Sequence, residues 1–407
     1  EEKYEETVAL YEEAASIYKK EYGEDHPNYL IYLSNVIYTK GLYFKDDNSY
    51  NAEKEWTEIL FKWEKLVGTN HPSYLTQTCN LATYYSKNKE HEKSKTLLAK
   101  NINIVKNVMG ENSQLYQTML WYMAVNNSSL GRVEEGLAYY NQFFGLKRDQ
   151  IRRFFTFLSE KERELFIQTF DESRDLFYAL SLGNEKDNPD ISGLFFDCEL
   201  LSKSLLLNSS RHLQYTINNS SDETLKQNWV NLKAAKNELI KLEEKGTEKQ
   251  KEVLEEKVNV LEKEVLSQSK QYNDMQQDFS LRWRDIQKAL SANEAAIEII
   301  NIKKMSQNQD SEIITDTIYS AAILCSDYEY PQIIYLCKEK DLREQMQKSQ
   351  YNLTDIYSLV WKPLEEHLQK KKSLYIAPSG LLHEIPFSSF ENSHYNIHNV
   401  LSTKDIP

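Results

Sequence analysis

The chain has 407 residues, a hydrophobic content of 40% and a formal net charge of −13. This length is enough for two to four domains at about 100 to 200 residues each, and the composition is that of a globular protein. The acidic balance argues against a nucleic-acid backbone or an anionic membrane as the main partner, because both repel negative charge.

The four cysteines (Cys79, Cys198, Cys325 and Cys337) are widely scattered and form no C-x-x-C pair. This usage fits a reducing cytoplasm, and no apolar run reaches the roughly 18 residues of a membrane span. No signal peptide follows Glu1, and the first residues have the pattern of the middle of a helix, so we expect a fragment of a longer protein. Motifs for phosphate or metal chemistry are missing, so no cofactor and no metal site are expected.

The N-terminal part of the sequence repeats itself. Residues 22–30 (Y-G-E-D-H-P-N-Y-L) recur at 67–75 (V-G-T-N-H-P-S-Y-L) and more weakly at 109–116. The marker glycines Gly23, Gly68 and Gly110 give a period of roughly 42 to 45 residues, which is typical of a solenoid of helical hairpins.

Each copy has the composition of a junction between two helices. The glycine is expected in the left-handed αL conformation as the stop of one helix, and Pro27 or Pro72 begins the next. Apolar residues then recur at three- and four-residue steps, which predicts helices that pack through amphipathic faces. The residues at these steps are Leu30, Leu33, Ile37, Trp56, Ile59, Leu60, Trp63, Leu75, Leu81 and Ala82.

The G-x-x-H-P pattern and a later asparagine resemble tetratricopeptide (TPR) repeats of the kinesin-light-chain-like type. In such repeats the first helix of each pair lines a groove, so the resemblance implies that Asn35 and Asn80 bind a peptide backbone. Bonding to a neighbouring helix or to solvent is the alternative. His26 and His71 are expected to cap or pack rather than to bind a metal. The third copy departs from the pattern, with Tyr122 in place of the asparagine.

The middle of the chain loses the period but keeps helical patterning. Ser159 and Glu162 form a capping-box-like helix start. Residues 222–290 are highly charged with heptad-like apolar spacing, which predicts an antiparallel helical hairpin or, as its rival, a dimeric coiled coil. The predicted seam consists of Leu232, Ala235, Leu239, Leu242, Leu254, Val258, Leu261, Val265, Gln268, Tyr272, Met275 and Phe279.

After Leu290 the pattern becomes that of an α/β segment. The predicted strands are 295–302, 318–325, 332–337, 374–377 and 381–385, with a turn at 327–331. Glu298 interrupts the first of them. A helix is expected to open at Thr354 and to carry one apolar face made of Ile356, Val360, Leu364 and Leu368. The strand–helix–strand order predicts a sheet covered by helices on both sides.

The run at 373–390 reads S-L-Y-I-A-P-S-G-L-L-H-E-I-P-F-S-S-F. A strand, P-x-G-x-L and I-P-F in this order resemble the signature of the CHAT domain, a caspase-like cysteine peptidase family. Ser379 stands where that family often has aspartate. The resemblance implies the N-terminal half of a CHAT domain, with the family's catalytic His and Cys beyond Pro407. The run L-S-E-K-E-R at 158–163 also resembles the linker between TPR and CHAT parts.

No residue of this chain matches a catalytic position of the family. A dyad of Cys325 or Cys337 with His383, His394 or His398 finds little support, because both cysteines follow apolar runs and no glycine follows the histidines.

The predicted fold class is mainly α: a TPR-like α-solenoid and a long helical hairpin, followed by a partial α/β caspase-like segment. The expected domains are TPR repeats (1–145), further helical repeats or linker (146–221), the hairpin or coiled coil (222–290) and the CHAT half (291–407). The predicted function is the sensing and scaffold portion of a TPR–CHAT cysteine protease. A non-catalytic adaptor for protein–protein interaction is the alternative. A protein or peptide partner is expected in the groove, and self-association through the coiled-coil segment stays open.

Overall fold

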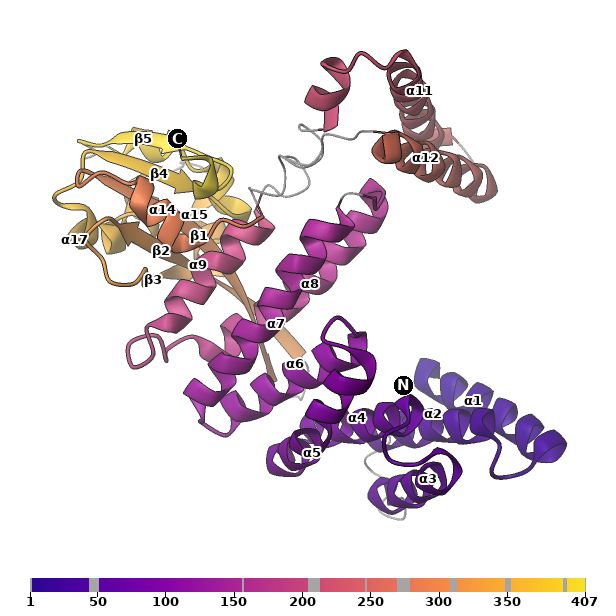
Figure 1. Ribbon diagram of the computed structural model, residues 1–407. Coiled ribbons are helices and arrows are strands. Elements are labelled where there is room, and N and C mark those ends of the chain that lie inside the picture. Colours follow the sequence, from indigo (N-terminus) through magenta and orange to yellow (C-terminus); the bar gives the residue numbers. More distant parts are fainter. Residues whose placement is uncertain are drawn as a thin grey trace. The chain divides into compact units, whose positions relative to one another are not determined.

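The computed structural model describes residues 2–43, 51–155, 157–203, 213–245, 247–268, 279–307, 313–347, 353–390 and 394–406. The chain forms two compact units, Glu1–Leu146 and Lys147–Pro407. The first is made of paired helices, and the second combines helices with a five-stranded mixed sheet (Figure 1). The predicted fold class is therefore confirmed at this level.

The first unit is a row of helices in which α2 packs on α3 and α4 packs on α5, while α2, α4 and α6 contact one another in succession. Trp121 of α6 lies against Tyr140 and Phe143 of α7, with ring centroids 5.6 and 5.0 Å apart. The helices are α1 (Glu2–Tyr22), α2 (Pro27–Tyr43), α3 (Ala52–Val67), α4 (Pro72–Lys87), α5 (His91–Met109), α6 (Gln114–Ser129) and α7 (Val133–Phe154), the last of which continues into the second unit.

Glycines end the second helix of successive pairs, as predicted, but not in the αL conformation. Gly68 and Gly110 follow α3 and α5 with φ of 83° and 84° and with ψ of 165° and 161°. Their positive φ matches the expectation, whereas their ψ places them in an extended region that glycine alone occupies without strain. The N–H groups of Gly68 and Gly110 donate to the carbonyls of Glu64 and Lys106 and so satisfy helix-end acceptors.

The predicted apolar faces form the core of the first unit. Leu33 and Leu60 are half-buried at its margin. Large side chains on α3 fill the space between successive first helices, which buries apolar area that an isolated hairpin would expose. The buried members of this cluster are Leu30, Ile37, Ala52, Trp56, Ile59, Trp63, Leu81 and Tyr85.

In the second unit, long helices precede the sheet. The capping box predicted at the start of α8 is confirmed, because Ser159 accepts from the Glu162 N–H and Glu162 accepts from the Ser159 N–H. The helices of this part are α8 (Glu160–Ser181), α9 (Asp190–Ser202), α11 (Glu223–Lys245), α12 (Glu248–Gln268) and α14 (Trp283–Ala289).

The predicted helical hairpin is also confirmed, because α11 and α12 pack on each other within the chain. The part of the expected seam at Tyr272 and Met275, and the side chain of Gln268, lie outside the described residues. The buried seam positions within the two helices are Leu232, Ala235, Leu254, Val258 and Val265.

The sheet has the strand order β3-β2-β1-β4-β5. The first three strands form an antiparallel meander, while β4 runs parallel to β1 and β5 runs parallel to β4. Four strands lie where the sequence predicted them, and the first two are longer than predicted. The strands are β1 (Glu294–Gln307), β2 (Ile313–Cys325), β3 (Gln332–Lys338), β4 (Ser373–Ala377) and β5 (Asn396–Asn399).

Helices cover both faces of the sheet, as expected. Ile297 and Ile299 of β1 share one core with the helices that follow β3, among them α15 (Glu339–Met346) and α16 (Leu353–Val360). The opposite face of β1, which carries Ile300, contacts α8 and α9. Each face is thus closed by a different part of the second unit.

Two local predictions in this unit were wrong. The helix expected from Thr354 breaks after Val360, because Pro363 cannot continue it, and a 3₁₀ turn η1 (Lys362–Leu364) and a short α17 (Glu365–Leu368) follow. The expected strand at 381–385 is instead the 3₁₀ turn η2 (Gly380–Glu384). There the N–H of Leu381 donates to the Tyr319 hydroxyl at 3.0 Å, which replaces strand pairing.

Candidate functional site

The candidate site is the surface formed by α2, α4 and α6, the first helices of the three pairs; we call it the first-helix face. Pro27 and Pro72 are the first residues of α2 and α4, so Asn35 and Asn80 occupy the same position of each helix. Both side chains are half-buried. Tyr122 of α6 takes the corresponding place in the third pair, and it too is half-buried.

The residues around these positions are in contact from one helix to the next. The ammonium of Lys87 on α4 lies 5.5 Å from the ring centroid of Tyr38 on α2. Burial raises the pKa of Tyr122 on α6, which keeps the phenol neutral, and Lys87 and Tyr38 both contribute to its electrostatic surroundings. Side chains from three successive helices therefore share one surface.

Asparagine chemistry suits this surface to a peptide backbone. An amide group offers a donor and an acceptor together, which is what a peptide unit requires. The side-chain amide of Asn80 donates to the side-chain oxygen Oε1 of Gln77 at 3.5 Å, which is a long bond that a stronger acceptor can replace. The predicted binding role of Asn35 and Asn80 stays a prediction.

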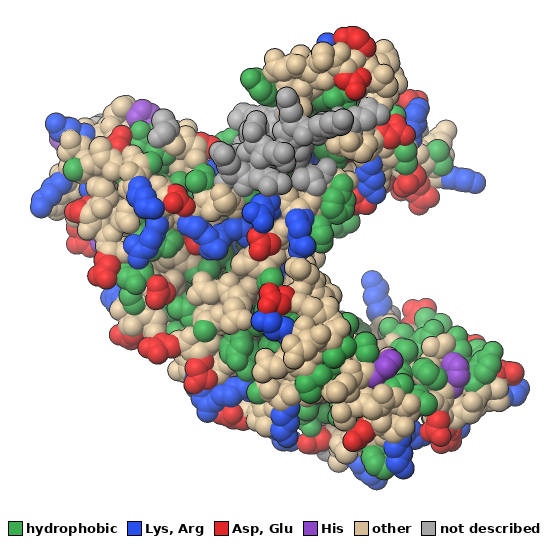
Figure 2. Space-filling model, in the orientation of Figure 1, with side chains coloured by type: hydrophobic (Ala, Val, Ile, Leu, Met, Phe, Trp, Pro, Cys, Tyr) green, Lys and Arg blue, Asp and Glu red, His purple; other side chains and the backbone are tan. Residues whose placement is uncertain are grey.

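Aromatic side chains extend the surface towards α1. Tyr4 of α1 stacks on Tyr43 of α2 with ring centroids 3.6 Å apart, and both side chains are exposed. Figure 2 shows hydrophobic side chains, a class that there includes tyrosine, gathered on the visible face of the array around α1 and α2. Exposed tyrosines combine apolar contact area with a hydroxyl, and they are enriched in protein interfaces.

The two repeat histidines act as helix caps. Nδ1 of His26 accepts from the Asn28 N–H at 3.2 Å, and Nδ1 of His71 accepts from the Ser73 N–H at 3.1 Å. In the third copy Ser113 caps the corresponding helix. These bonds supply the capping role that the sequence predicted.

The cysteines of the second unit are poor nucleophiles. Cys325 and Cys337 are buried, and burial raises both thiol pKa values, that of Cys337 to about 12. Since the thiolate is the reactive form, neither residue fits a catalytic dyad. His398 stacks on Tyr375 within the sheet, with ring centroids 4.9 Å apart.

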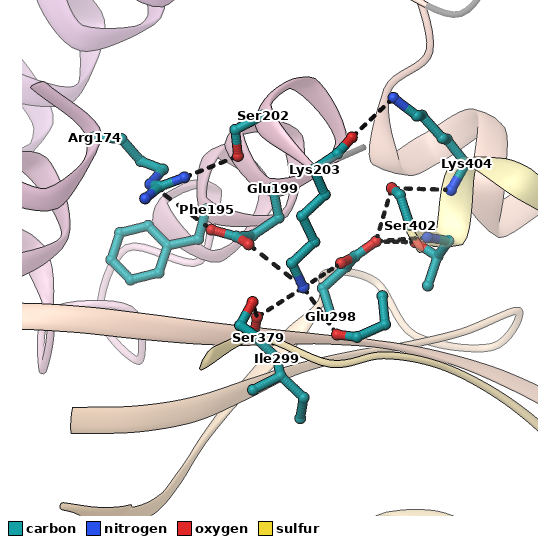
Figure 3. Close-up of polar contacts among 12 residues, drawn as sticks. Arg174, Phe195, Glu199, Ser202, Lys203, Glu298, Ile299, Ser379, Ser402 and Lys404 are labelled. Carbon is teal, nitrogen blue, oxygen red and sulfur yellow. Dashed lines mark hydrogen bonds and ion pairs between the residues drawn. The ribbon is translucent and has the colours of Figure 1, made fainter. Parts of the chain in front are cut away.

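A polar centre that was not predicted from the sequence lies on the sheet face covered by α9 (Figure 3). Glu298 of β1 is fully buried and pairs with the ammonium of Lys203, which follows α9, at 2.7 Å. The same ammonium donates to the carbonyls of Ile299 at 2.7 Å and Ala377 at 2.8 Å. With three acceptors around it, the Lys203 ammonium is a structural link of this centre.

The second oxygen of Glu298 binds the turn η4 (Thr403–Asp405). It accepts from the Thr403 N–H and hydroxyl, each at 2.7 Å, and from the Ser402 hydroxyl at 3.2 Å. The ammonium of Lys404 donates to the backbone carbonyl of Lys203 at 3.0 Å (Figure 3). One carboxylate therefore ties α9, β1 and η4 together. Glu298 was the sequence signal for this centre, as a charge within an apolar strand.

The same network continues away from the sheet to α8. Glu199 of α9 accepts from the Tyr178 hydroxyl at 2.9 Å and lies 3.5 Å from the Lys203 ammonium. Arg174 of α8 donates to the Ser202 hydroxyl at 2.8 Å. These bonds join α8, α9 and the sheet through satisfied buried groups, which is the arrangement of a structural core.

A family model for the tetratricopeptide repeat matches residues 2–28, which include α1 and the Gly23–His26–Pro27 junction. No curated protein matches the chain. Within the described part of the chain, no helix is both long enough and apolar enough to cross a bilayer. The chain thus carries a tetratricopeptide repeat at its N-terminus within a region of paired helices, a kind of structure that serves protein–protein interaction.

Proposed function

We propose that this protein is a protein-binding scaffold that holds an extended segment of a partner protein on the first-helix face. The observation that carries the proposal is the row of half-buried polar side chains at equivalent positions of α2, α4 and α6: Asn35, Asn80 and Tyr122. Together with the repeat match at residues 2–28, this row supports a peptide groove.

The spacing of the row suits an extended chain. Packed helix axes lie about 8–10 Å apart, and an extended peptide rises about 3.3 Å per residue. Successive helices therefore meet such a peptide about every third residue. The asparagine amides would bond its backbone, which gives affinity without strict sequence demands, while the tyrosines would contact its side chains.

The test is a binding measurement on the full 407-residue chain with a peptide selected from a displayed library. Asn35→Ala and Asn80→Ala are each expected to weaken binding about fivefold to thirtyfold, the equivalent of one or two lost hydrogen bonds. Asn107→Ala is the matched control, because Asn107 is an exposed asparagine of α5 outside the first-helix face. Equal affinity for all three variants would refute the assignment.

A more specific proposal is that this chain is the sensing and scaffold portion of a TPR–CHAT caspase-like cysteine protease. Its domain limits would be those expected from the sequence. Its support is the run at 373–390, whose Gly380 approaches Tyr319 too closely for any side chain and whose Phe387 and Phe390 join the sheet core. The alternative is a non-catalytic adaptor with the same repeats.

A thiol-directed peptidase probe such as a peptidyl acyloxymethyl ketone separates these two functions. Applied to the protein purified from its natural source, the probe is expected to form a covalent adduct if a peptidase is present. Failure to label under conditions that label a known caspase-like enzyme would favour the adaptor.

A further inference from the structure

The first turn of α8 has no part in the proposed function, yet its charges have an unusual arrangement. Four consecutive residues, at 160–163, each form an ion pair with the α11–α12 hairpin. They lie within the L-S-E-K-E-R run that the sequence singled out. The pairs are Glu160 with Lys236, Lys161 with Glu255, Glu162 with Lys263 at 2.7 Å and Arg163 with Glu262 at 2.8 Å.

The charges alternate along α8, where they run negative, positive, negative, positive, and each meets an opposite charge on the hairpin. Four consecutive residues point around a full helical turn, so their partners come from both α11 and α12. A shift of α12 by one residue would put Glu262 or Glu264 in the place of Lys263, opposite Glu162, so this pair favours one seating of the hairpin.

The contact contains one buried pair surrounded by exposed ones. Arg163 and Glu262 have side chains that are 1% and 3% exposed, and the guanidinium lies 5.8 Å from the Phe155 ring centroid. The pair of Lys161 and Glu255 is far more exposed. Salt screens the attraction in exposed pairs. In a buried pair, removing one partner is strongly destabilising, because the remaining charge stays desolvated.

Charged side chains line most of the space between α8 and the hairpin. An open pocket of about 470 Å³ lies between them; Glu164, Lys236 and Glu255 are among its charged lining residues, and Leu239, Ile240 and Val258 form its apolar part. Opposite charges are therefore the main complementary feature of this pocket.

We propose that the contact of α8 with the α11–α12 hairpin is a releasable latch, in which the alternating charges of residues 160–163 hold the hairpin of the same chain in one register. Release would separate the paired charges and expose the buried pair of Arg163 and Glu262 to solvent. The proposal is independent of the peptide groove, because it concerns residues of the second unit alone.

The test is a distance measurement by spin labelling of the full chain. Gln168→Cys on α8 and Val253→Cys on α12 provide exposed labelling positions, while the four native cysteines are buried. At low salt we expect one narrow distance distribution. In about 1 M salt, where the screening length falls to about 3 Å, a second and longer distance is expected to grow several-fold.

Charge variants of the labelled protein test the pairing itself. Lys161→Glu is expected to lower the ratio of docked to released hairpin about twofold to fivefold, and adding Glu255→Lys should restore it. Glu262→Gln, which removes the buried negative charge opposite the Arg163 guanidinium, is expected to lower the ratio on the order of a hundredfold. The double variant Arg163→Met with Glu262→Leu should dock again, which separates release from misfolding.

The outcomes decide the proposal even if one variant fails to fold. A narrow distance that persists in high salt and in Lys161→Glu would overturn the latch. Failure of Glu255→Lys to restore docking in the Lys161→Glu variant would show that this ion pair does not hold the hairpin to α8. A longer distance that appears with salt and follows the charge swaps would support both.

Discussion

Glu298→Ala tests the polar centre that fixes α9 to the sheet. The substitution removes the carboxylate that faces the Lys203 ammonium at 2.7 Å and leaves that cation in a site where its side chain is 10% exposed. It also removes the acceptor for three donors of Ser402 and Thr403. The strand should remain, because alanine is tolerated in a buried position, but its attachment to α9 and η4 should weaken.

The magnitude follows from the burial. Removing one member of a buried pair costs about 3–5 kcal/mol, because the other charge stays desolvated. Glu199, at 3.5 Å from the same ammonium, offsets part of this loss, so we expect about 3 kcal/mol. In the double variant Glu298→Leu with Lys203→Met no charge remains unpaired, and most of the stability should return.

The assay is amide hydrogen exchange of β1 and β4 in the full chain, which reports the second unit separately from the repeats. Glu344→Ala, at an exposed acid of α15, is the control and should change the opening free energy by less than about 0.5 kcal/mol. A loss below about 1 kcal/mol in Glu298→Ala would show that the buried carboxylate does not hold α9 and η4 to the sheet.

Three further predictions concern the second unit. Residues 295–407 expressed alone should aggregate, because α8 and α9 no longer cover one sheet face and an edge strand stays unpaired; a soluble fragment with a cooperative melt would contradict this. Cys337, whose thiol pKa burial raises to about 12, should react with iodoacetamide at neutral pH only as fast as the fold opens, and alkylation at the rate of a free thiol would show the burial to be wrong. Asp197 has its pKa raised to about 6 by burial, from an ordinary 3.8, so its contribution to stability is complete below about pH 4 and is lost as pH rises through 6. Unfolding free energies of the native chain should therefore fall relative to Asp197→Asn by about 2 kcal/mol between pH 4 and 7, and a constant difference would refute the shifted pKa.

Local signals in the sequence were enough for much of the fold. The strand at β1 could be predicted because Ile297, Ile299 and Ile300 belong to one β-branched run, and Pro27 and Pro72 set the helix starts that bring Asn35 and Asn80 into register. These features depend on neighbours along the chain, which is the range over which propensity and capping act.

Contacts between segments far apart in the chain could not be predicted from local sequence signals. Glu298 signalled a buried charge, but its partner Lys203 lies 95 residues earlier, in a region without a repeat. The short apolar run at 381–385 has the composition of a strand, and only the bond from Leu381 to Tyr319, 62 residues away, decides for a 3₁₀ turn. Tertiary contacts override a weak local preference in such short runs.

On the first-helix face, too, local features could be predicted from the sequence, whereas contacts between helices could not. The equivalence of Asn35 and Asn80 follows from local spacing, whereas the contact of Lys87 with Tyr38 depends on how α4 stacks against α2. The latch at 160–163 was visible only as a capping box and a charged run, because its partners lie about 76 to 101 residues further along.

We propose that a partner segment lies along α2, α4 and α6. Amide hydrogen exchange of the full chain, with and without a library-selected peptide, measures whether it does. Slower exchange is expected in the backbone amides of these three helices, with no change in α3 and α5. Protection centred on α3 and α5, or on the second unit alone, would show that the segment binds elsewhere.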